Sequence, residues 1–111
     1  MIEVTDAILR QMVEATVDAI DPEQIILFGS RATGKAGPDS DVDILIVDSK
    51  PFGENRSPRK QLGDIQRLLL DFPFPLDLLL FTRDEVLKWR SSRNHVIGRA
   101  MREGKVIYER S

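Results

Sequence analysis

Two aspartates, Asp41 and Asp43, stand at the start of an apolar run that continues to Val47. Successive side chains of a strand alternate between its faces, so these two carboxylates project from the same side and lie close together. Two anions held at this distance repel each other unless a cation lies between them. Carboxylate oxygens in this arrangement suit Mg²⁺ that is shared with the phosphates of a substrate. The spacing therefore predicts a magnesium site.

A turn suited to phosphate comes shortly before this pair. The apolar run Gln24–Phe28 ends at Gly29-Ser30, where a residue without a side chain, a hydroxyl and backbone N–H groups allow a phosphate to approach closely. Arg31 follows directly and is a candidate contact for a triphosphate. A strand, a phosphate-binding turn and a strand that begins with carboxylates together predict a site for nucleotide chemistry.

Two familiar loop motifs resemble parts of this stretch, and both are excluded. Residues 29–36 differ from a P-loop by one residue, but Ala36 replaces the Ser or Thr that would hold magnesium, and a strand follows where a P-loop requires a helix. Residues 39–43 imitate the start of a calcium-binding loop. That loop needs glycine where Ile44 stands and glutamate where Lys50 stands, so the match fails.

A third carboxylate, Asp77, interrupts the later apolar run Pro75–Phe81. Burying a lone carboxylate in such a run is costly unless it is paired or bound to a metal. A neighbouring strand would place it beside Asp41 and Asp43, which makes it a candidate metal ligand. The alternative is an aspartate at the end of a strand that reaches water near Pro75.

The elements that must position these residues follow from periodicity, capping residues and breakers. The expected elements are a helix from Thr5 to Ile20, a strand over Gln24–Phe28, a short helix over Ser30–Thr33, a strand over Asp41–Val47, a helix from its cap Ser57 toward Pro73, a strand over Pro75–Phe81, a helix from the capping box Thr82–Glu85 to Arg90, a short helix over Asn94–Gly104, and an edge strand over Lys105–Glu109. This order predicts an α/β (α+β) fold with a small mixed β-sheet of about four strands and helices mainly on one face. We expect one domain over residues 1–111.

The composition narrows the classes of protein without identifying one. The net charge of −2 does not indicate a nucleic-acid or membrane partner. The absence of cysteine excludes disulfides and thiolate metal sites. The charged N-terminal stretch fits neither a signal peptide nor a membrane span, so we expect a cytoplasmic protein.

The single histidine, His95, is interpreted as a structural residue. The basic C-terminal helical region is interpreted as a solvated face, with a docking surface for an acidic partner or an RNA as the alternative; its residues are Lys88, Arg90, Arg93, Arg99 and Arg102.

Gly29-Ser30, ten intervening residues and Asp41-x-Asp43 form a pattern that resembles the nucleotidyltransferase superfamily that includes polymerase beta. The sequence GSRATG together with Ser40-Asp41 is similar to the minimal nucleotidyltransferase branch of that superfamily, antitoxins included. The resemblance implies the nucleotidyltransferase fold, two Mg²⁺ ions and ATP as a substrate. By position it implies that the metal is held by the three aspartates Asp41, Asp43 and Asp77, and the nucleotide by Gly29, Ser30, Arg31 and Ser40.

The resemblance also implies an activity and a partner. The expected reaction transfers a nucleoside monophosphate, AMP from ATP, to a hydroxyl. Since the chain leaves little room for an acceptor-binding domain, we expect the acceptor on another molecule: a tyrosine of a partner HEPN-domain toxin, with this chain as the antitoxin of a type VII toxin–antitoxin pair and a homo- or hetero-oligomer as the assembly. The alternatives are an antitoxin that acts by contact with vestigial catalysis, and a transferase for a small molecule or an RNA end. The sequence does not determine base preference, oligomeric state or strand order.

Overall fold

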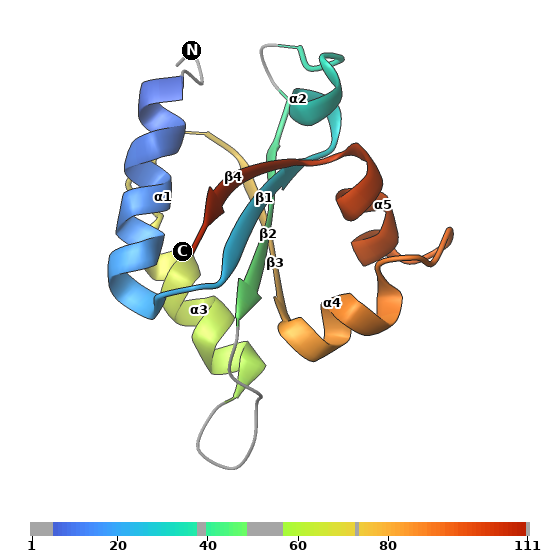
Figure 1. The fold of residues 1–111 in the computed structure, drawn as a ribbon. Coiled ribbons are helices and arrows are strands. Elements are labelled where there is room, and N and C mark those ends of the chain that lie inside the picture. The colour runs from blue at the N-terminus through green and yellow to red at the C-terminus, as the bar shows by residue number, and fades with distance from the viewer. Residues whose placement is uncertain (1–5, 38–39, 49–56, 73, 111) are drawn as a thin grey trace.

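The computed structural model describes residues 6–37, 40–48, 57–72 and 74–110. Their centre is a four-stranded sheet in the order β3-β2-β1-β4 (Figure 1). The strands are β1 (Gln24–Phe28), β2 (Val42–Asp48), β3 (Leu76–Thr82) and β4 (Lys105–Glu109). Strands β2 and β3 are parallel, whereas β1 pairs antiparallel with both β2 and β4. The predicted small mixed sheet is confirmed, with its last strand at an edge.

The helices cover both faces of this sheet. They are α1 (Asp6–Ile20), α2 (Ser30–Thr33), α3 (Pro58–Leu68), α4 (Arg83–Trp89) and α5 (Val96–Glu103). Figure 1 shows α1 and α3 on one side of the strands and α4 and α5 on the other. The expectation of helices mainly on one face therefore needs correction. In the described ranges, no helix is both long and apolar enough to cross a membrane.

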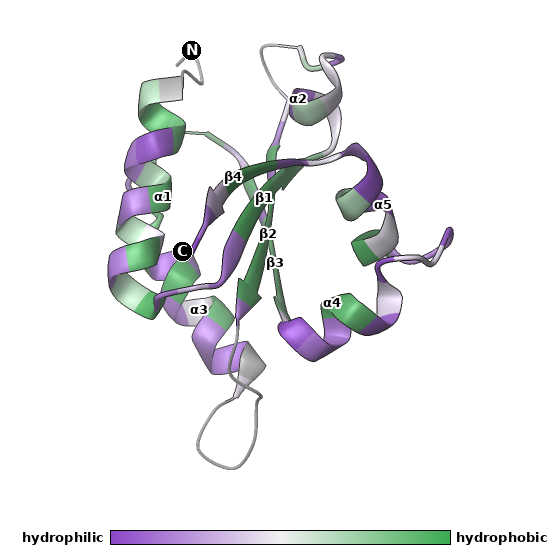
Figure 2. Ribbon diagram, in the orientation of Figure 1, coloured by the Kyte–Doolittle hydropathy of each residue, from purple (hydrophilic) through white to green (hydrophobic). Residues whose placement is uncertain are grey.

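The central strand β2 explains why two layers of helices are needed. Its side chains at Ile44 and Ile46 join one core cluster, which includes Met12 of α1 and Ile65 of α3. Its intervening side chains at Leu45 and Val47 join a second core cluster, with Val86 of α4 and Ile97 of α5. Figure 2 shows the central strands as the apolar middle of the fold. A strand that is apolar on both faces is stable only when both faces are covered.

Capping side chains mark the starts of α3, α4 and α5, and the caps of α3 and α4 are the predicted ones. The Thr82 hydroxyl accepts a hydrogen bond from the backbone N–H of Glu85 (3.2 Å), and a Glu85 carboxylate oxygen accepts one from the backbone N–H of Thr82 (3.0 Å). Ser57 caps α3 through the backbone N–H of Lys60. His95 caps α5, because its Nδ1 accepts a hydrogen bond from the backbone N–H of Ile97 (3.1 Å), so its expected structural role is confirmed.

Some predicted boundaries shift. Helix α3 ends at Leu68 instead of continuing toward Pro73, and the chain goes on in turns where Leu70 and Phe72 donate backbone hydrogen bonds three residues back. Strands β2 and β3 begin and end one residue later than predicted, and α5 begins at Val96. The predicted cap Thr5 and the predicted loop over residues 50–56 lie outside the described residues.

The capping box gives a stability prediction. Thr82→Ala removes the acceptor for the backbone N–H of Glu85 and should lower the free energy of unfolding by about 1 kcal/mol. Ser91→Ala, in an exposed turn, is the control and should change stability by less than about 0.5 kcal/mol. Chemical denaturation followed by circular dichroism measures both; equal losses would show that the capping box does not stabilise α4.

Candidate active site

The register of the parallel strands places Asp43 of β2 directly beside Asp77 of β3. Residues paired in this way point to the same face of a sheet, on strands about 4.8 Å apart. Their strand neighbours identify that face: Leu45, Val47 and Leu79 belong to the core cluster under α4 and α5. Two predicted ligands that are far apart in the sequence thus become neighbours at one end of the sheet.

The electrostatics of Asp43 show that Asp41 belongs to the same group. Burial of the Asp43 carboxyl raises its pKa above the ordinary value of 3.8, and the negative charges of Asp77 and then Asp41 raise it further. A carboxyl whose pKa is raised by two like charges lies in a field that favours a cation. The charges of Asp77 and Asp41 therefore both act on Asp43, at the starts of β2 and β3.

The three carboxylates nevertheless do not form a preassembled cage. Asp41 and Asp77 are exposed and Asp43 is half-buried. Over residues 6–37, 40–48, 57–72 and 74–110, no three His, Cys, Asp or Glu side chains converge closely enough to hold a metal ion as they stand. Mg²⁺ is bound in proteins by carboxylate oxygens, usually together with phosphate oxygens of a substrate. The three aspartates supply such oxygens from neighbouring positions at the starts of β2 and β3, so they fit this ion.

The exposure of Asp77 corrects one step of the sequence analysis. The cost of burying a lone carboxylate predicted a ligand here, but the Asp77 side chain is not buried. What connects it to the site is its pairing with Asp43. Parallel pairing of two strands separated by a helix is not visible in the sequence of either strand.

Gly29 brings the turn after β1 against the carboxylates. Its backbone angles, φ 74° and ψ −156°, belong to a region that essentially only glycine adopts. A Cβ atom at this position would overlap Oδ2 of Asp43. Glycine is therefore required twice, once by the backbone conformation and once by the close approach of the turn to Asp43.

Helix α2 follows this turn as predicted and begins at Ser30. The Gly29 carbonyl accepts hydrogen bonds from the backbone N–H groups of Ala32 (3.1 Å) and Thr33 (3.2 Å). Gly34, with φ 78° and ψ 11°, ends the helix in the left-handed conformation. The short helix places Ser30 next to Gly29, at the end of the sheet that carries Asp43.

Arg31 and Ser40 make a contact that the sequence analysis missed. Nε and Nη2 of Arg31 both donate to the carbonyl oxygen of Ser40, at 3.2 and 2.8 Å. The Ser40 hydroxyl accepts a hydrogen bond from the backbone N–H of Gly37 (2.9 Å), and the Ser40 N–H donates to the Gly37 carbonyl (3.2 Å). Arg31 thereby fastens the segment before Asp41 to α2. Neither residue carried a signal of this pairing, and their contact with a nucleotide stays a prediction.

This arrangement is suited to bind a phosphate together with a divalent cation. The Asp43 carboxylate alone would repel a phosphate brought to Gly29, because it lies directly against that residue. A divalent cation between the carboxylates and the phosphate removes that repulsion and links the two parts of the site. The turn and the aspartates are therefore useful together only when metal and phosphate bind together.

The comparisons with known proteins agree with this geometry. Residues 10–111 match the family described as polymerase beta, nucleotidyltransferase, and the chain belongs to this family. It therefore carries a nucleotidyltransferase domain. Among functionally curated proteins, no sequence matches this chain.

Two solved structures share the fold. One is a Sulfolobus solfataricus protein described as a candidate nucleotidyltransferase; it is 19% identical, with a TM-score of 0.64, and the match covers 94% of this chain and 79% of that one. The other is a toxin–antitoxin complex with AMP-PNP; the matched chain is 18% identical, with a TM-score of 0.60, over 91% of this chain and 73% of that one. At these identities the likeness establishes the nucleotidyltransferase fold.

The two positive-φ glycines around α2 provide a matched pair of variants. Gly29→Ala should destabilise the protein by about 1–3 kcal/mol and displace the Asp43 side chain. Gly34→Ala meets no atom within 4 Å and should cost only the left-handed strain, about 1 kcal/mol. Denaturation gives the stabilities, and NMR of the carboxyl carbons reports Asp43. If Gly34→Ala shifts the Asp43 signal as much as Gly29→Ala does, the proposed close approach is wrong.

The raised pKa of Asp43 predicts how stability depends on pH. Because the folded state binds this proton more tightly, the carboxyl's contribution to stability is fully present below its ordinary pKa of 3.8 and is lost as the pH rises through the folded pKa. Asp43→Asn should therefore raise the thermal midpoint at pH 7, by a small amount because the group is only partly buried, and the gain should vanish in acid. Asp71→Asn, at an exposed aspartate outside the site, is the control. A lowered midpoint for Asp43→Asn at pH 7 would contradict the repulsion.

Proposed function

We propose that this chain is a Mg²⁺-dependent nucleotidyltransferase that transfers AMP from ATP to a hydroxyl on a partner protein. The observation that carries the proposal is the pairing of Asp43 with Asp77 against Gly29, in a chain of the polymerase beta nucleotidyltransferase family. Carboxylates beside a glycine turn suit a phosphate bound through a divalent cation. They provide no covalent nucleophile of the serine or cysteine type.

In this proposal, different residues bind the metal and position the phosphates. Asp41, Asp43 and Asp77 hold Mg²⁺, which when bound neutralises the triphosphate and lowers the pKa of the attacking hydroxyl. The backbone at Gly29 and Ser30 approaches the phosphates, and Arg31 keeps the Ser40 carbonyl in place before Asp41. The acceptor oxygen forms a bond to the α-phosphorus, and the bond to pyrophosphate breaks. The protein contributes position and charge.

The acceptor we propose is a tyrosine of a HEPN-domain toxin, which makes this chain the antitoxin of a type VII toxin–antitoxin pair acting in the cytoplasm. The exposure of Asp41 and Asp77 supports a large acceptor, because the carboxylates can be reached from outside the domain. The fold shared with a toxin–antitoxin complex that holds AMP-PNP is consistent with this partner and with an adenine nucleotide.

Transfer from ATP labelled in the α-phosphate tests this proposal. The purified chain is incubated with a candidate HEPN-domain partner, with and without Mg²⁺. We expect label on a partner tyrosine, lost on chelation and reduced by about a hundredfold or more in Asp43→Asn and Asp77→Asn. Asp71→Asn, which is outside the site, should label the partner at the rate of the parent chain.

The same purified proteins distinguish neutralisation of the partner by nucleotidyl transfer from neutralisation by binding alone. If an Asp41→Ala, Asp43→Ala double variant still neutralises the partner fully, the chain acts by binding and the catalytic proposal is wrong. If label is transferred to a small molecule or to an RNA end and to no partner protein, the proposed nucleotidyl-transfer activity stands and the proposed tyrosine acceptor is wrong.

A further inference from the structure

The corner where α4 turns into α5, residues 88–96, concentrates positive charge on a chain whose net charge is −2. Lys88, Arg90 and Arg93 lie here, and no Asp or Glu occurs from residue 86 to residue 102. Within the described part of the chain, none of these three cations forms an ion pair, whereas Arg83 pairs with Glu23 and Arg99 with Glu103. We call residues 88–96 the α4–α5 corner.

Exposed apolar side chains accompany these cations. Trp89 is 37% exposed and Val96 is 37% exposed, and Leu87, next to the corner, is 52% exposed. The six large hydrophobic side chains that are exposed in the described residues thus include three from this region. Tryptophan and arginine are among the residues most enriched at the positions that dominate protein–protein binding energies.

The Trp89 ring is already held in one position. The His95 ring stacks on it with centroids 4.6 Å apart and an interplanar angle of 13°. The ammonium of Lys88 lies over the same indole, 5.1 Å from its centroid. Ordering this side chain on binding would cost little entropy, because it is ordered beforehand.

The backbone of the α4–α5 corner is also fastened to α5. Arg102 donates hydrogen bonds to the carbonyls of Ser92 (3.0 Å) and Arg93 (3.4 Å). Gly98 allows the turn to lie directly on the helix, because a Cβ there would overlap the Ser92 carbonyl oxygen. An exposed polar turn that is held this firmly presents a fixed arrangement of charge and apolar surface.

We propose that the α4–α5 corner is a docking surface for an acidic protein that presents carboxylates around an apolar centre. Lys88, Arg90 and Arg93 supply the charge complementarity, and Trp89 and Val96 supply the apolar anchor. Protein is favoured over RNA because single-stranded nucleic acid is bound by stacking its bases on open aromatic faces. The His95 ring already covers one face of the Trp89 indole. The part of the indole that stays exposed suits contact with side chains of a partner protein.

This surface is separate from the candidate active site. Strand β3 leads away from Asp77 to Thr82, so α4 begins at the end of that strand opposite Asp77. Figure 1 shows the turn between α4 and α5 on the side of the fold away from α1. The proposal does not depend on the nucleotidyl-transfer reaction.

Fluorescence of Trp89 tests the proposal, because it is the only tryptophan in the chain. The probes are a random glutamate–tyrosine copolymer, poly-glutamate, and a single-stranded oligouridylate, each titrated with excitation selective for tryptophan. We expect the copolymer to bind most tightly, and added salt to weaken it. Reversing Lys88, Arg90 and Arg93 to Glu should weaken copolymer binding by about tenfold or more.

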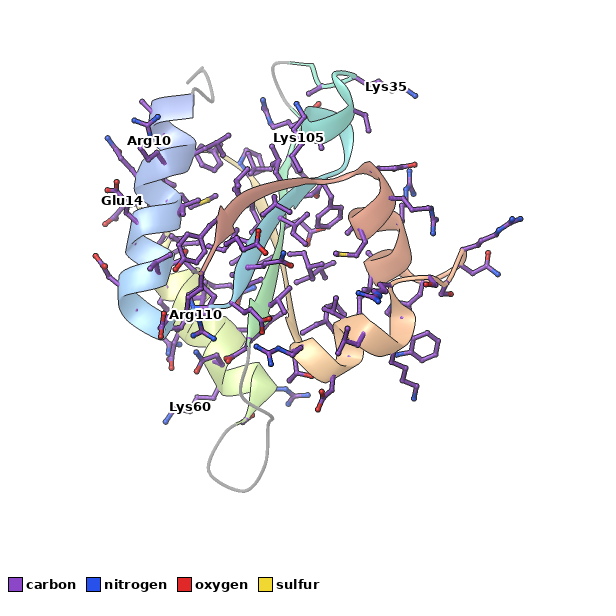
Figure 3. The ribbon with its side chains drawn as sticks, viewed as in Figure 1. Arg10, Glu14, Lys35, Lys60, Lys105 and Arg110 are labelled. Carbon is purple, nitrogen blue, oxygen red and sulfur yellow. The ribbon has the colours of Figure 1, made fainter. Side chains whose placement is uncertain are left out.

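The control variant reverses Arg10, Lys35 and Lys60 to Glu, which changes the net charge by the same amount. Figure 3 shows these three cations on α1, after α2 and on α3. Their reversal should leave copolymer affinity within about twofold, and a comparable loss in both variants would mean that only overall charge matters. Tighter binding of oligouridylate would assign the surface to RNA. Dimerisation in sedimentation that the Lys88, Arg90 and Arg93 reversal abolishes would assign it to a second copy; either result overturns the proposal.

Discussion

The repulsion between Asp43 and Asp77 is the constraint that the rest of the structure must hold in place. Parallel pairing fixes these residues side by side, and nothing in their own chemistry favours that position. The interior of β2 opposes the repulsion, since Ile44, Leu45 and Ile46 are each no more than 1% exposed and pack into two separate cores. A slip of one residue would exchange the faces of every side chain in that strand, so the register cannot relax to separate the charges.

The second part of the site is built from backbone. Gly29 lets the turn after β1 lie against Asp43, in a conformation closed to other residues. Arg31 then ties the carbonyl of Ser40, the residue before Asp41, to α2. The Gly29 turn and the Asp43 carboxylate are thus positioned by different interactions: a backbone conformation of glycine for the turn, and the pairing of β2 with β3 for the carboxylate.

Local signals in the sequence predicted most of the individual elements. Strand β1, the short helix α2 and the capping box at Thr82 occur where apolar runs, glycine and capping residues indicated them. Longer-range features were less visible. The apolar run after Asp43 indicated burial on both faces of β2, yet the helices that cover the second face were not assigned there. The contact between Arg31 and the Ser40 carbonyl depends on tertiary structure, and no residue type or spacing in the sequence predicts it. The expected burial of Asp77 is wrong, because its side chain is exposed, whereas its expected place on a strand beside Asp43 is confirmed by the pairing of β3 with β2.

The central claim is that Asp41, Asp43 and Asp77 hold one metal centre beside Gly29. Anomalous diffraction from crystals grown with Mn²⁺ and a non-hydrolysable ATP analogue tests it most directly. We predict a manganese peak in contact with carboxylate oxygens of Asp43 and Asp77, with the phosphates of the analogue against the Gly29 turn. An ordered nucleotide whose metal contacts neither aspartate, or no metal at all in crystals saturated with both ligands, would contradict it.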